Sequence, residues 1–252
     1  MAWFCAACHP RIFLYLYSMS IFLPVIVTFF AYLVGSLSFA VMVSRWMGLS
    51  DPRTFGSQNP GATNVLRTGS KAAAVLTLML DVAKGGLPVV LVKWLGQPYG
   101  LGDGTVALVG LAVFLGHVYP VFFRFAGGKG VATALGVLLG TSVWLGLATV
   151  LIWVVMALVF RYSSLAAVCS AVLSPMVYVL GDGELWIRNK SVTLSIAVMA
   201  LFLLYRHAPN INRLILGTES CIGKKVTDSA KPSHHRPHRE HKPHSNHSGD
   251  AP

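Results

Sequence analysis

Long uncharged apolar stretches alternate with short polar segments along most of this chain. No charged residue occurs within the ranges 12–44, 104–123, 130–160, 162–181 and 191–205. A helix needs about 20 apolar residues to cross the hydrocarbon core of a bilayer. The pattern therefore predicts an all-α membrane protein, a bundle of transmembrane helices.

The predicted helices can be placed to within a few residues. They cover residues 21–43, 72–95, 105–123, 131–139, 143–160, 165–180 and 192–205. The fourth is short for a full span, which predicts a half-length or re-entrant helix. The plausible break after it is Gly140-Thr141-Ser142, a small and polar step between apolar runs. We expect about seven membrane segments.

Composition excludes several other classes of protein. The chain has 252 residues, of which 54% are hydrophobic and 12% charged. Soluble domains carry about 25% charged residues. A secreted disulfide scaffold, a soluble enzyme fold and a mostly disordered chain do not fit these values, and the mean hydropathy of +0.63 agrees.

The distribution of basic residues predicts the orientation in the membrane, because short cytoplasmic loops are enriched in Lys and Arg. The segment between the first two spans carries Arg45, Arg53, Arg67 and Lys71 against Asp51. The loop 96–104 holds only Asp103 and is predicted to lie outside. Lys129 and Arg161 share the cytoplasmic side only if the uncharged chain between them crosses twice or not at all. We expect the N-terminus outside and the C-terminus inside, and no nucleic-acid partner for the net charge of +11.

The ends of the chain differ from the middle. We divide the sequence into a leader (1–18), a transmembrane domain (19–222) and a disordered cytoplasmic tail rich in His, Lys and Arg (223–252). Met19 is an alternative start. Cys5 and Cys8 have no second pair to complete a metal site, so no metal or cofactor is expected there. At the tail, a metal ion and an anionic lipid surface remain alternative partners.

Three polar clusters lie at predicted cytoplasmic helix ends. The first, residues 56–67, contains Ser57, Asn59, Thr63, Asn64 and Arg67. Closely spaced glycines let backbone N–H groups approach an anion, and Arg is a suited phosphate partner. A flexible turn-rich loop is the plainer interpretation. The mixture of hydroxyl, amide and guanidinium groups favours an anion site.

The second cluster contains Gly127, Gly128, Lys129 and Gly130, just before an apolar helix. Free N–H groups and the positive dipole end of a helix favour phosphate there. It is not a Walker A loop, which would need Gly at position 123 and Ser or Thr at position 130.

The third cluster runs from residue 205 to 213 and includes Arg206, His207 and Asn210, with Glu219 following. Headgroup anchoring is the alternative interpretation of the Arg and His. In the second span, Asp81 and Lys84 share one helix face, where a structural ion pair and a catalytic role are equally open.

Taken together, these motifs resemble the PlsY family, the acyl-phosphate:glycerol-3-phosphate acyltransferases of bacterial membranes. The resemblance spans residues 32–219 and adds two further motifs, Gly116-His117-x-x-Pro120 and Arg161-Tyr162-x-Ser164. Gln58 departs from it, because the family usually has Gly there. The resemblance implies a seven-helix bundle in the cell inner membrane with its site on the cytoplasmic face.

The implied reaction moves a fatty acyl group from acyl phosphate to the 1-hydroxyl of glycerol 3-phosphate, giving lysophosphatidic acid in the first step of phospholipid synthesis. By resemblance, Gly127, Gly128 and Gly130 cradle glycerol phosphate, with Lys129 nearby. Ser57, Thr63, Asn64 and Arg67 hold acyl phosphate, and Asn59 belongs to the same motif. Ser164, His207 and Asn210 complete the site. We expect Glu219 to be structural, paired with a nearby base.

Three routes for the hydroxyl proton stay open. His207 has a pKa range suited to a general base. The departing phosphate of the donor can accept the proton instead, which we slightly favour. An acyl-enzyme on Ser57 is the third route, and it needs an adjacent base.

Two other classes fit less well. The His-x-x-x-x-Asp pair of other glycerolipid acyltransferases is missing, because Leu14, Phe122 and Asn212 follow the candidate histidines at that distance. A transporter of an organic phosphate predicts inverted repeats with broken helices near the midplane. We find no convincing internal repeat. A purely structural membrane subunit leaves the polar clusters unexplained.

Overall fold

Helices make up the regular structure of the computed structural model, which describes residues 10–222, with side chains from residue 22. They are α1 (Pro10–Gly35), α2 (Phe39–Trp46), α3 (Ala62–Val65), α4 (Lys71–Leu95), α5 (Asp103–Val118), α6 (Val131–Thr141), α7 (Val143–Phe160), α8 (Ser163–Leu180), α9 (Lys190–Arg206) and α10 (Ala208–Ile215). Short 3-10 turns lie at Leu66–Thr68, Gln97–Tyr99 and Val121–Phe123. The all-helical prediction is confirmed for this part of the chain. Cys5, Cys8 and the tail lie outside the described residues.

Four helices are long and apolar enough to cross a membrane, namely α4, α5 extended to Phe123, α7 and α8. Two bent pairs, α1 with α2 and α9 with α10, raise the number to six if each pair is one span. The helix α6 is apolar but has only 11 residues. At about 1.5 Å per residue it is roughly half as long as the hydrocarbon core is thick.

The first predicted span is not one continuous helix. The helix α1 ends at Gly35, and α2 resumes at Phe39 after a bend of 43°. A Cβ at Gly35 would lie 2.1 Å from the carbonyl oxygen of Val113, so α1 meets α5 backbone to backbone. In the break, the Ser36 hydroxyl donates to the Tyr32 carbonyl at 2.9 Å. The same carbonyl also accepts the Ser36 backbone N–H, and a second bond of this kind from a serine hydroxyl often bends a helix.

Glycines hold α6 closely against α4. A Cβ at Gly136 would lie 2.0 Å from the Val82 carbonyl oxygen, and one at Gly85 would lie 2.2 Å from that of Thr133. Small residues allow such close backbone contact between membrane helices. Further along, a Cβ at Gly140 would lie 2.9 Å from the Gly86 carbonyl oxygen. The contacts thus advance from Val82 with Gly136 to Gly86 with Gly140, so α4 and α6 run in the same direction. The N-terminus of α6 therefore lies beside the middle of α4.

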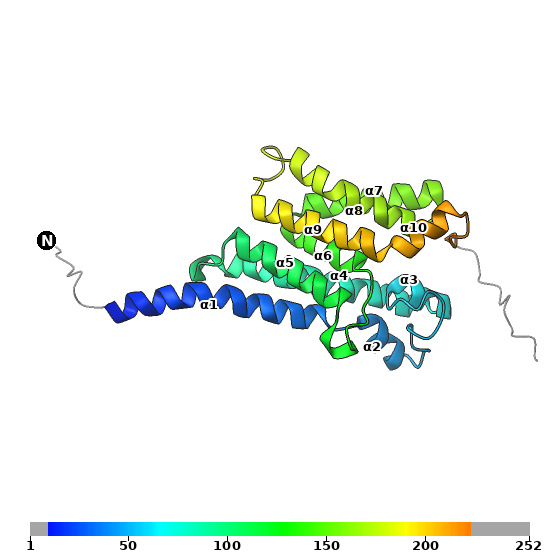
Figure 1. Cartoon of the computed structure of the whole chain (residues 1–252), viewed down its shortest axis with the longest axis horizontal. Coiled ribbons are helices and arrows are strands. Elements are labelled where there is room, and N and C mark those ends of the chain that lie inside the picture. Colours follow the sequence, from blue (N-terminus) through cyan, green and yellow to red (C-terminus); the bar gives the residue numbers. More distant parts are fainter. Residues whose placement is uncertain (1–9, 223–252) are drawn as a thin grey trace, which may run out of the picture.

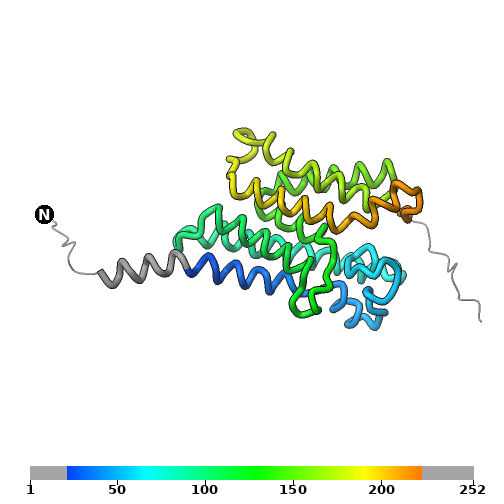
Figure 2. Tube along the Cα trace, in the orientation of Figure 1, coloured from blue at the N-terminus to red at the C-terminus, as the bar shows by residue number. Residues whose placement is uncertain are grey.

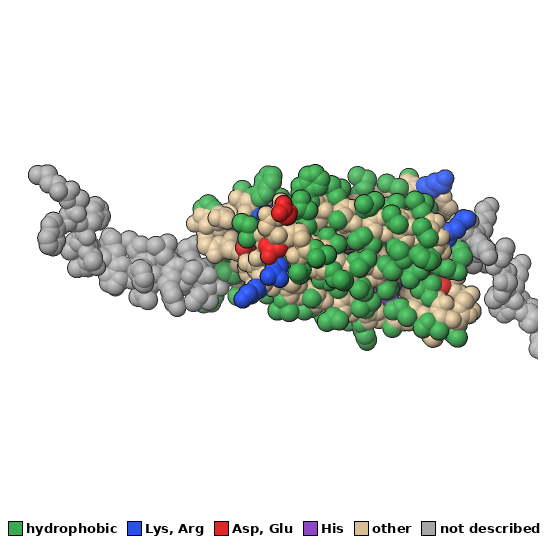
Figure 3. Space-filling model, turned by 90° about the horizontal axis from the view of Figure 1, so that it is seen from above, with side chains coloured by type: hydrophobic (Ala, Val, Ile, Leu, Met, Phe, Trp, Pro, Cys, Tyr) green, Lys and Arg blue, Asp and Glu red, His purple; other side chains and the backbone are tan. Residues whose placement is uncertain are grey.

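The helices run side by side along the long axis of the molecule (Figure 1). One group contains α1, α4 and α5, the other contains α7, α8 and α9, and α6 lies between them. The segments around α2, α3 and α10 gather at one end, as the trace also shows (Figure 2). Apolar side chains cover the middle of the face in Figure 3, and charged side chains lie towards the two ends.

Candidate active site

A cavity at this end of the bundle draws its lining from all three polar clusters. It encloses about 230 Å³ and is lined by Ser57, Gln58, Asn59, Gly127, Lys129, Arg206, Pro209, Asn210 and Arg213. These residues belong to the loop before α3, the loop before α6 and the bend between α9 and α10. The fold thus brings together groups that lie about 70–150 positions apart in the sequence.

The buried side chain of Asn64 organises the first loop. Its Oδ1 accepts hydrogen bonds from the Ser57 backbone N–H at 3.1 Å and from Arg67 Nη1 at 3.2 Å. Its Nδ2 donates to the carbonyls of Pro52 at 2.6 Å and Phe55 at 3.1 Å. The amide is therefore used within the loop. Asn64 connects the Ser57 backbone to the Arg67 guanidinium and does not line the cavity.

The glycine loop before α6 is packed too closely for side chains. A Cβ at Gly127 would lie 2.2 Å from the His117 carbonyl oxygen, and one at Gly128 would lie 2.2 Å from His117 Nε2. Gly130 has φ +89° and faces the Phe114 ring. The loop leads directly into the N-terminus of α6, where unpaired N–H groups and the helix dipole attract anions.

A chain of polar contacts links the glycine loop to the third cluster. Lys129 Nζ donates to Asn210 Oδ1, and Asn210 Nδ2 donates to Glu219 Oε1 at 2.7 Å. Glu219 Oε2 in turn accepts from Arg213 Nε at 2.7 Å. The expected pairing of Glu219 with a nearby base is therefore observed. Separately, Arg206 Nη2 donates to the Gly127 carbonyl at 2.9 Å.

The cavity is electropositive. Burial lowers the pKa of Lys129 to about 8, Glu219 opposes this shift, and Arg213, Arg206 and Arg67 add to it. The pKa of Glu219 lies below its ordinary value, because hydrogen bonds from Asn210 and from Arg213 outweigh burial. The carboxylate is thus ionised and already paired, which leaves an excess of cationic groups able to receive a phosphate.

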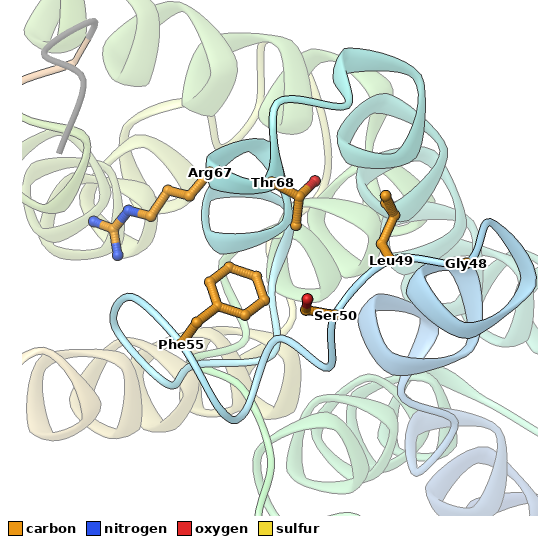
Figure 4. A pocket seen from close by; sticks show the side chains of 6 residues that line it. All are labelled: Gly48, Leu49, Ser50, Phe55, Arg67 and Thr68. Atoms are coloured by element: carbon orange, nitrogen blue, oxygen red, sulfur yellow. The ribbon is translucent and has the colours of Figure 1, made fainter. Parts of the chain in front are cut away.

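Arg67 lines a second cavity next to the first. This cavity encloses about 260 Å³ between Gly48, Leu49, Ser50, Phe55, Arg67 and Thr68. The Phe55 ring stands between Arg67 and Ser50, as Figure 4 shows. Arg67 Nη2 also donates to the Ser220 hydroxyl at 3.2 Å. The first cluster therefore contacts both cavities, one through Ser57 and the other through Arg67.

Some predicted site residues lie outside the two cavities. Thr63 is solvent-exposed, whereas Ser164 and His207 are 7% and 2% exposed. The buried Ser164 hydroxyl lies near the Glu219 carboxylate and helps to lower its pKa, although no hydrogen bond of regular geometry joins the two. His207 Nδ1 lies 2.8 Å from the Leu203 carbonyl oxygen, so this nitrogen carries the donated proton and Nε2 is the free acceptor.

Sequence reasoning missed Arg206 and Arg213 as cavity residues. Arg206, Asn210 and Arg213 are spaced by four and three positions, which places them on one side when the segment is helical. The sequence predicts a last span that ends at residue 205 and no helix after it, whereas α10 begins at Ala208. Pro209 in the first turn of α10 is the start signal that could have shown this.

No group of three or more His, Cys, Asp or Glu side chains suited to a metal ion occurs within residues 10–222. The cationic and amide groups around the cavities suit an anion rather than a metal. The fold and the site together define a multi-pass helical membrane protein with an electropositive cavity at one end of its helix bundle.

Comparison with known proteins assigns the family. The family model for glycerol-3-phosphate acyltransferase matches residues 25–217. The chain is 63% identical to the glycerol-3-phosphate acyltransferase of Albidiferax ferrireducens, over 86% of this chain and 97% of that protein. It is 57% identical to the one from Bordetella pertussis, over 77% of this chain and 90% of that protein.

Solved structures agree with this assignment. Crystal structures of PlsY (YgiH), an integral membrane glycerol 3-phosphate acyltransferase, match with TM-scores of 0.72 for the glycerol 3-phosphate form and 0.71 for the lysophosphatidic acid form. The identities are 37% and 36%, over 79% of this chain and 96% and 95% of those chains. The chain belongs to the glycerol-3-phosphate acyltransferase family. It is a membrane acyltransferase, and the resemblance found in the sequence is confirmed.

Proposed function

We propose that this protein transfers a fatty acyl group from acyl phosphate to the 1-hydroxyl of glycerol 3-phosphate, releasing lysophosphatidic acid and inorganic phosphate. The observation that carries the proposal is the electropositive cavity in which all three polar clusters meet. The glycerol 3-phosphate and lysophosphatidic acid forms of PlsY support this acceptor and product. A transporter is not favoured.

In this proposal the glycine loop binds the phosphate of the acceptor. Backbone N–H groups of Gly127 and Gly130 face it at the start of α6, and Lys129 supplies a charge. Gly128 shapes the loop, because its N–H donates to the His117 carbonyl at 3.2 Å. The contact of Lys129 with Asn210 supports this role, because the amide holds the ammonium group at the cavity wall. Preorganised donors of this kind bind a phosphate without having to reorganise.

The first loop binds the acyl phosphate. Arg67 holds its phosphate, while Ser57 and Asn59 face its carbonyl from the other cavity, with Thr63 near the entrance. Asn64 acts as a positioning residue, because one amide oxygen accepts from both the Ser57 backbone and the Arg67 guanidinium. The acyl chain lies between the helices or in the lipid.

In the chemical step, the hydroxyl oxygen attacks the acyl carbonyl carbon, the bond from that carbon to the phosphate oxygen breaks, and phosphate leaves. We propose that the departing phosphate takes the hydroxyl proton. The burial of His207 outside the cavity lining supports this route over a histidine base. An acyl-enzyme on Ser57 is disfavoured because no base contacts its hydroxyl among the described residues. Ser164 and His207 then support the site from behind.

The same proposal places the protein in the cell inner membrane, with the cavity on the cytoplasmic face. About seven membrane segments, the N-terminus outside and the C-terminus inside, agree with the positive-inside rule. The short α6 is then the half-length segment. Residues 19–222 form the acyltransferase domain, after a leader (1–18) and before a cytoplasmic tail (223–252) that contacts anionic lipid or a metal ion.

The reaction is tested with purified protein in lipid. Glycerol 3-phosphate is supplied with either acyl phosphate or acyl-CoA, and phosphate release and lysophosphatidic acid are followed. We expect product with acyl phosphate alone. Product only with acyl-CoA as donor would contradict the assignment of acyl phosphate as the donor. No product with either donor, from folded protein, would overturn the reaction, and flux assays in vesicles would then test transport.

The cationic groups are tested by substitution. We expect Arg67→Ala and Lys129→Ala each to lower kcat/KM by about 10²–10³-fold, as for loss of one preorganised donor, with membrane insertion unchanged. Arg53→Ala is the matched control, because Arg53 forms an exposed ion pair with Asp51 at 2.6 Å. Loss of insertion together with activity would make the residue structural instead.

A further inference from the structure

A buried ionic cluster lies between α4 and α5, and the proposed reaction does not use it. Asp81, Lys84 and His117 are 2%, 3% and 7% exposed. Lys84 Nζ lies 2.7 Å from Asp81 Oδ1, and His117 Nδ1 lies 3.6 Å from the same oxygen. One carboxylate oxygen thus faces both the Lys84 ammonium group and the His117 ring. Charged groups at membrane depth are costly and usually serve a function.

Lys84 also fixes the break between α1 and α2. Its ammonium group donates to the Leu37 carbonyl at 2.6 Å and lies 5.4 Å from the centre of the Phe39 ring. The break leaves that carbonyl without a helical partner. Lys84 therefore satisfies it and is itself held on two sides, which fixes the position of the Asp81 carboxylate.

His117 connects this cluster to the glycine loop. Its carbonyl accepts the Gly128 N–H at 3.2 Å, and a Cβ on Gly128 would lie 2.2 Å from His117 Nε2 and 3.0 Å from the Pro60 carbonyl oxygen. The imidazole is thus packed against the glycine loop on one side and faces Asp81 on the other. Gly128 thus lies between the His117 ring and the first loop at Pro60.

We propose that Asp81, Lys84 and His117 form a positioning network that sets the glycine loop for the phosphate of glycerol 3-phosphate. Lys84 fixes the Asp81 carboxylate, the carboxylate orients the His117 ring, and the ring supports Gly128. All three are positioning residues and none touches the reacting atoms. The inference rests on the proposed function, because it assigns the glycine loop to the acceptor phosphate.

The first test separates KM from kcat. In Asp81→Asn and Lys84→Met we expect KM for glycerol 3-phosphate to rise about tenfold or more, since small misplacements of binding groups are costly. We expect kcat and KM for the acyl donor to stay within about twofold. An equal rise in KM for both substrates, or an unchanged KM for glycerol 3-phosphate, would overturn the proposed network.

A matched control exists on the same helix. Lys93 donates to the Thr141 carbonyl at 2.6 Å, where α6 gives way to α7, far from the glycine loop. Lys93→Met removes the same kind of bond from α4, and we expect an unchanged KM for glycerol 3-phosphate. A rise equal to that of Lys84→Met would show a general effect of α4 and would contradict the proposal.

Single substitutions leave a buried charge unpaired and can prevent folding. The double variant Asp81→Asn/Lys84→Met removes both charges and keeps the volume nearly constant. We expect it to fold and to retain the raised acceptor KM. A folded double variant with the normal KM would overturn the proposal.

A double-mutant cycle tests whether Asp81 acts through His117. If it does, Asp81→Asn raises the acceptor KM in the native background and has little further effect in His117→Asn. Additive effects would contradict the order proposed. Turnover of the unsubstituted protein is measured first. If that protein shows no turnover, the proposed function is refuted. If it turns over and the variants keep its KM for glycerol 3-phosphate, only the network is refuted.

Discussion

Lys129 is the residue whose charge decides how the cavity meets an anion. It lies in the loop before α6, half-buried, with three arginines near it and one paired carboxylate opposite. Burial and these arginines stabilise the neutral amine and bring its pKa to about 8. Its charge is therefore lost as pH rises through about 8 rather than near its ordinary value of 10.5.

We predict that kcat/KM for glycerol 3-phosphate falls as pH rises through about 8. The protonated form present below this pH attracts the phosphate, and kcat/KM reports the free enzyme. A pH profile of initial rates checks this. Lys129→Arg should move the fall beyond the accessible range, and the same break in that variant would assign it to another group.

Gln58 has left-handed backbone, with φ +55°, where the family usually has Gly. This conformation costs an L-residue about 1–2 kcal/mol, part of which the greater freedom of unfolded Gly offsets. We predict that Gln58→Gly raises stability by about 0.5–1 kcal/mol and keeps activity, measured by thermal unfolding in detergent. An unchanged or lower unfolding temperature would show that the left-handed backbone at Gln58 is not strained.

Gly56 in the same loop, with φ +57°, gives the opposite expectation. A Cβ there would lie 2.4 Å from Asn64 Oδ1 and 3.1 Å from Arg67 Nη1. We predict that Gly56→Ala displaces Arg67 and lowers kcat/KM about tenfold or more. A kinetic assay of Gly56→Ala beside Gln58→Gly checks this. Full activity in Gly56→Ala would show that the position of Arg67 does not depend on the backbone conformation at Gly56.

At the scale of elements, the contact of α4 with α6 decides the depth of the site. Because α6 begins beside the middle of α4, its N-terminus and the glycine loop lie level with Asp81 and Lys84. The shortness of α6 thus follows from where it starts. The close approach depends on glycines, since any side chain there would meet backbone.

We predict that Gly136→Ala destabilises the protein by about 1–3 kcal/mol, the usual cost of overpacking, although Ala favours helices. Its Cβ would lie 2.0 Å from the Val82 carbonyl oxygen. Gly104→Ala on α5 is the control, with nothing within 4 Å of the added Cβ. Thermal unfolding of both variants checks this, and equal stability would show that α6 shifts without cost.

At the scale of the whole molecule, the site end and the loop after α8 lie at opposite ends of the bundle (Figure 1). The proposed orientation places them on opposite sides of the membrane. Thr54 and Glu184 are exposed at these two ends. Each can carry a single cysteine in a background whose native cysteines are replaced.

We predict that an impermeant thiol reagent labels Glu184→Cys on intact cells and labels Thr54→Cys only after permeabilisation. The positive-inside distribution of charge is the physical reason. Labelling of Thr54→Cys from outside would reverse the orientation. If the reagent labels both cysteines or neither on intact cells, the proposed number of membrane crossings between residues 54 and 184 is contradicted.

The sequence by itself determined the class of fold, the approximate helix bounds and the three clusters. Apolar length and loop charge report directly on the bilayer, so the helices now labelled α4, α7 and α8 agree within two residues with the predicted spans. In a Gly-rich loop that contains a cationic residue, the groups that favour an anion are neighbours in the sequence. These features depend on near neighbours in the chain, which a single sequence contains.

Only the tertiary structure decided which residues meet. The break at Ser36 depends on the close approach of α1 to α5. The use of Asn64 within its own loop, the turning of Arg206 and Arg213 into the cavity, and the link from Asp81 to the glycine loop all join distant segments. Such contacts depend on how helices pack, and no local pattern encodes them.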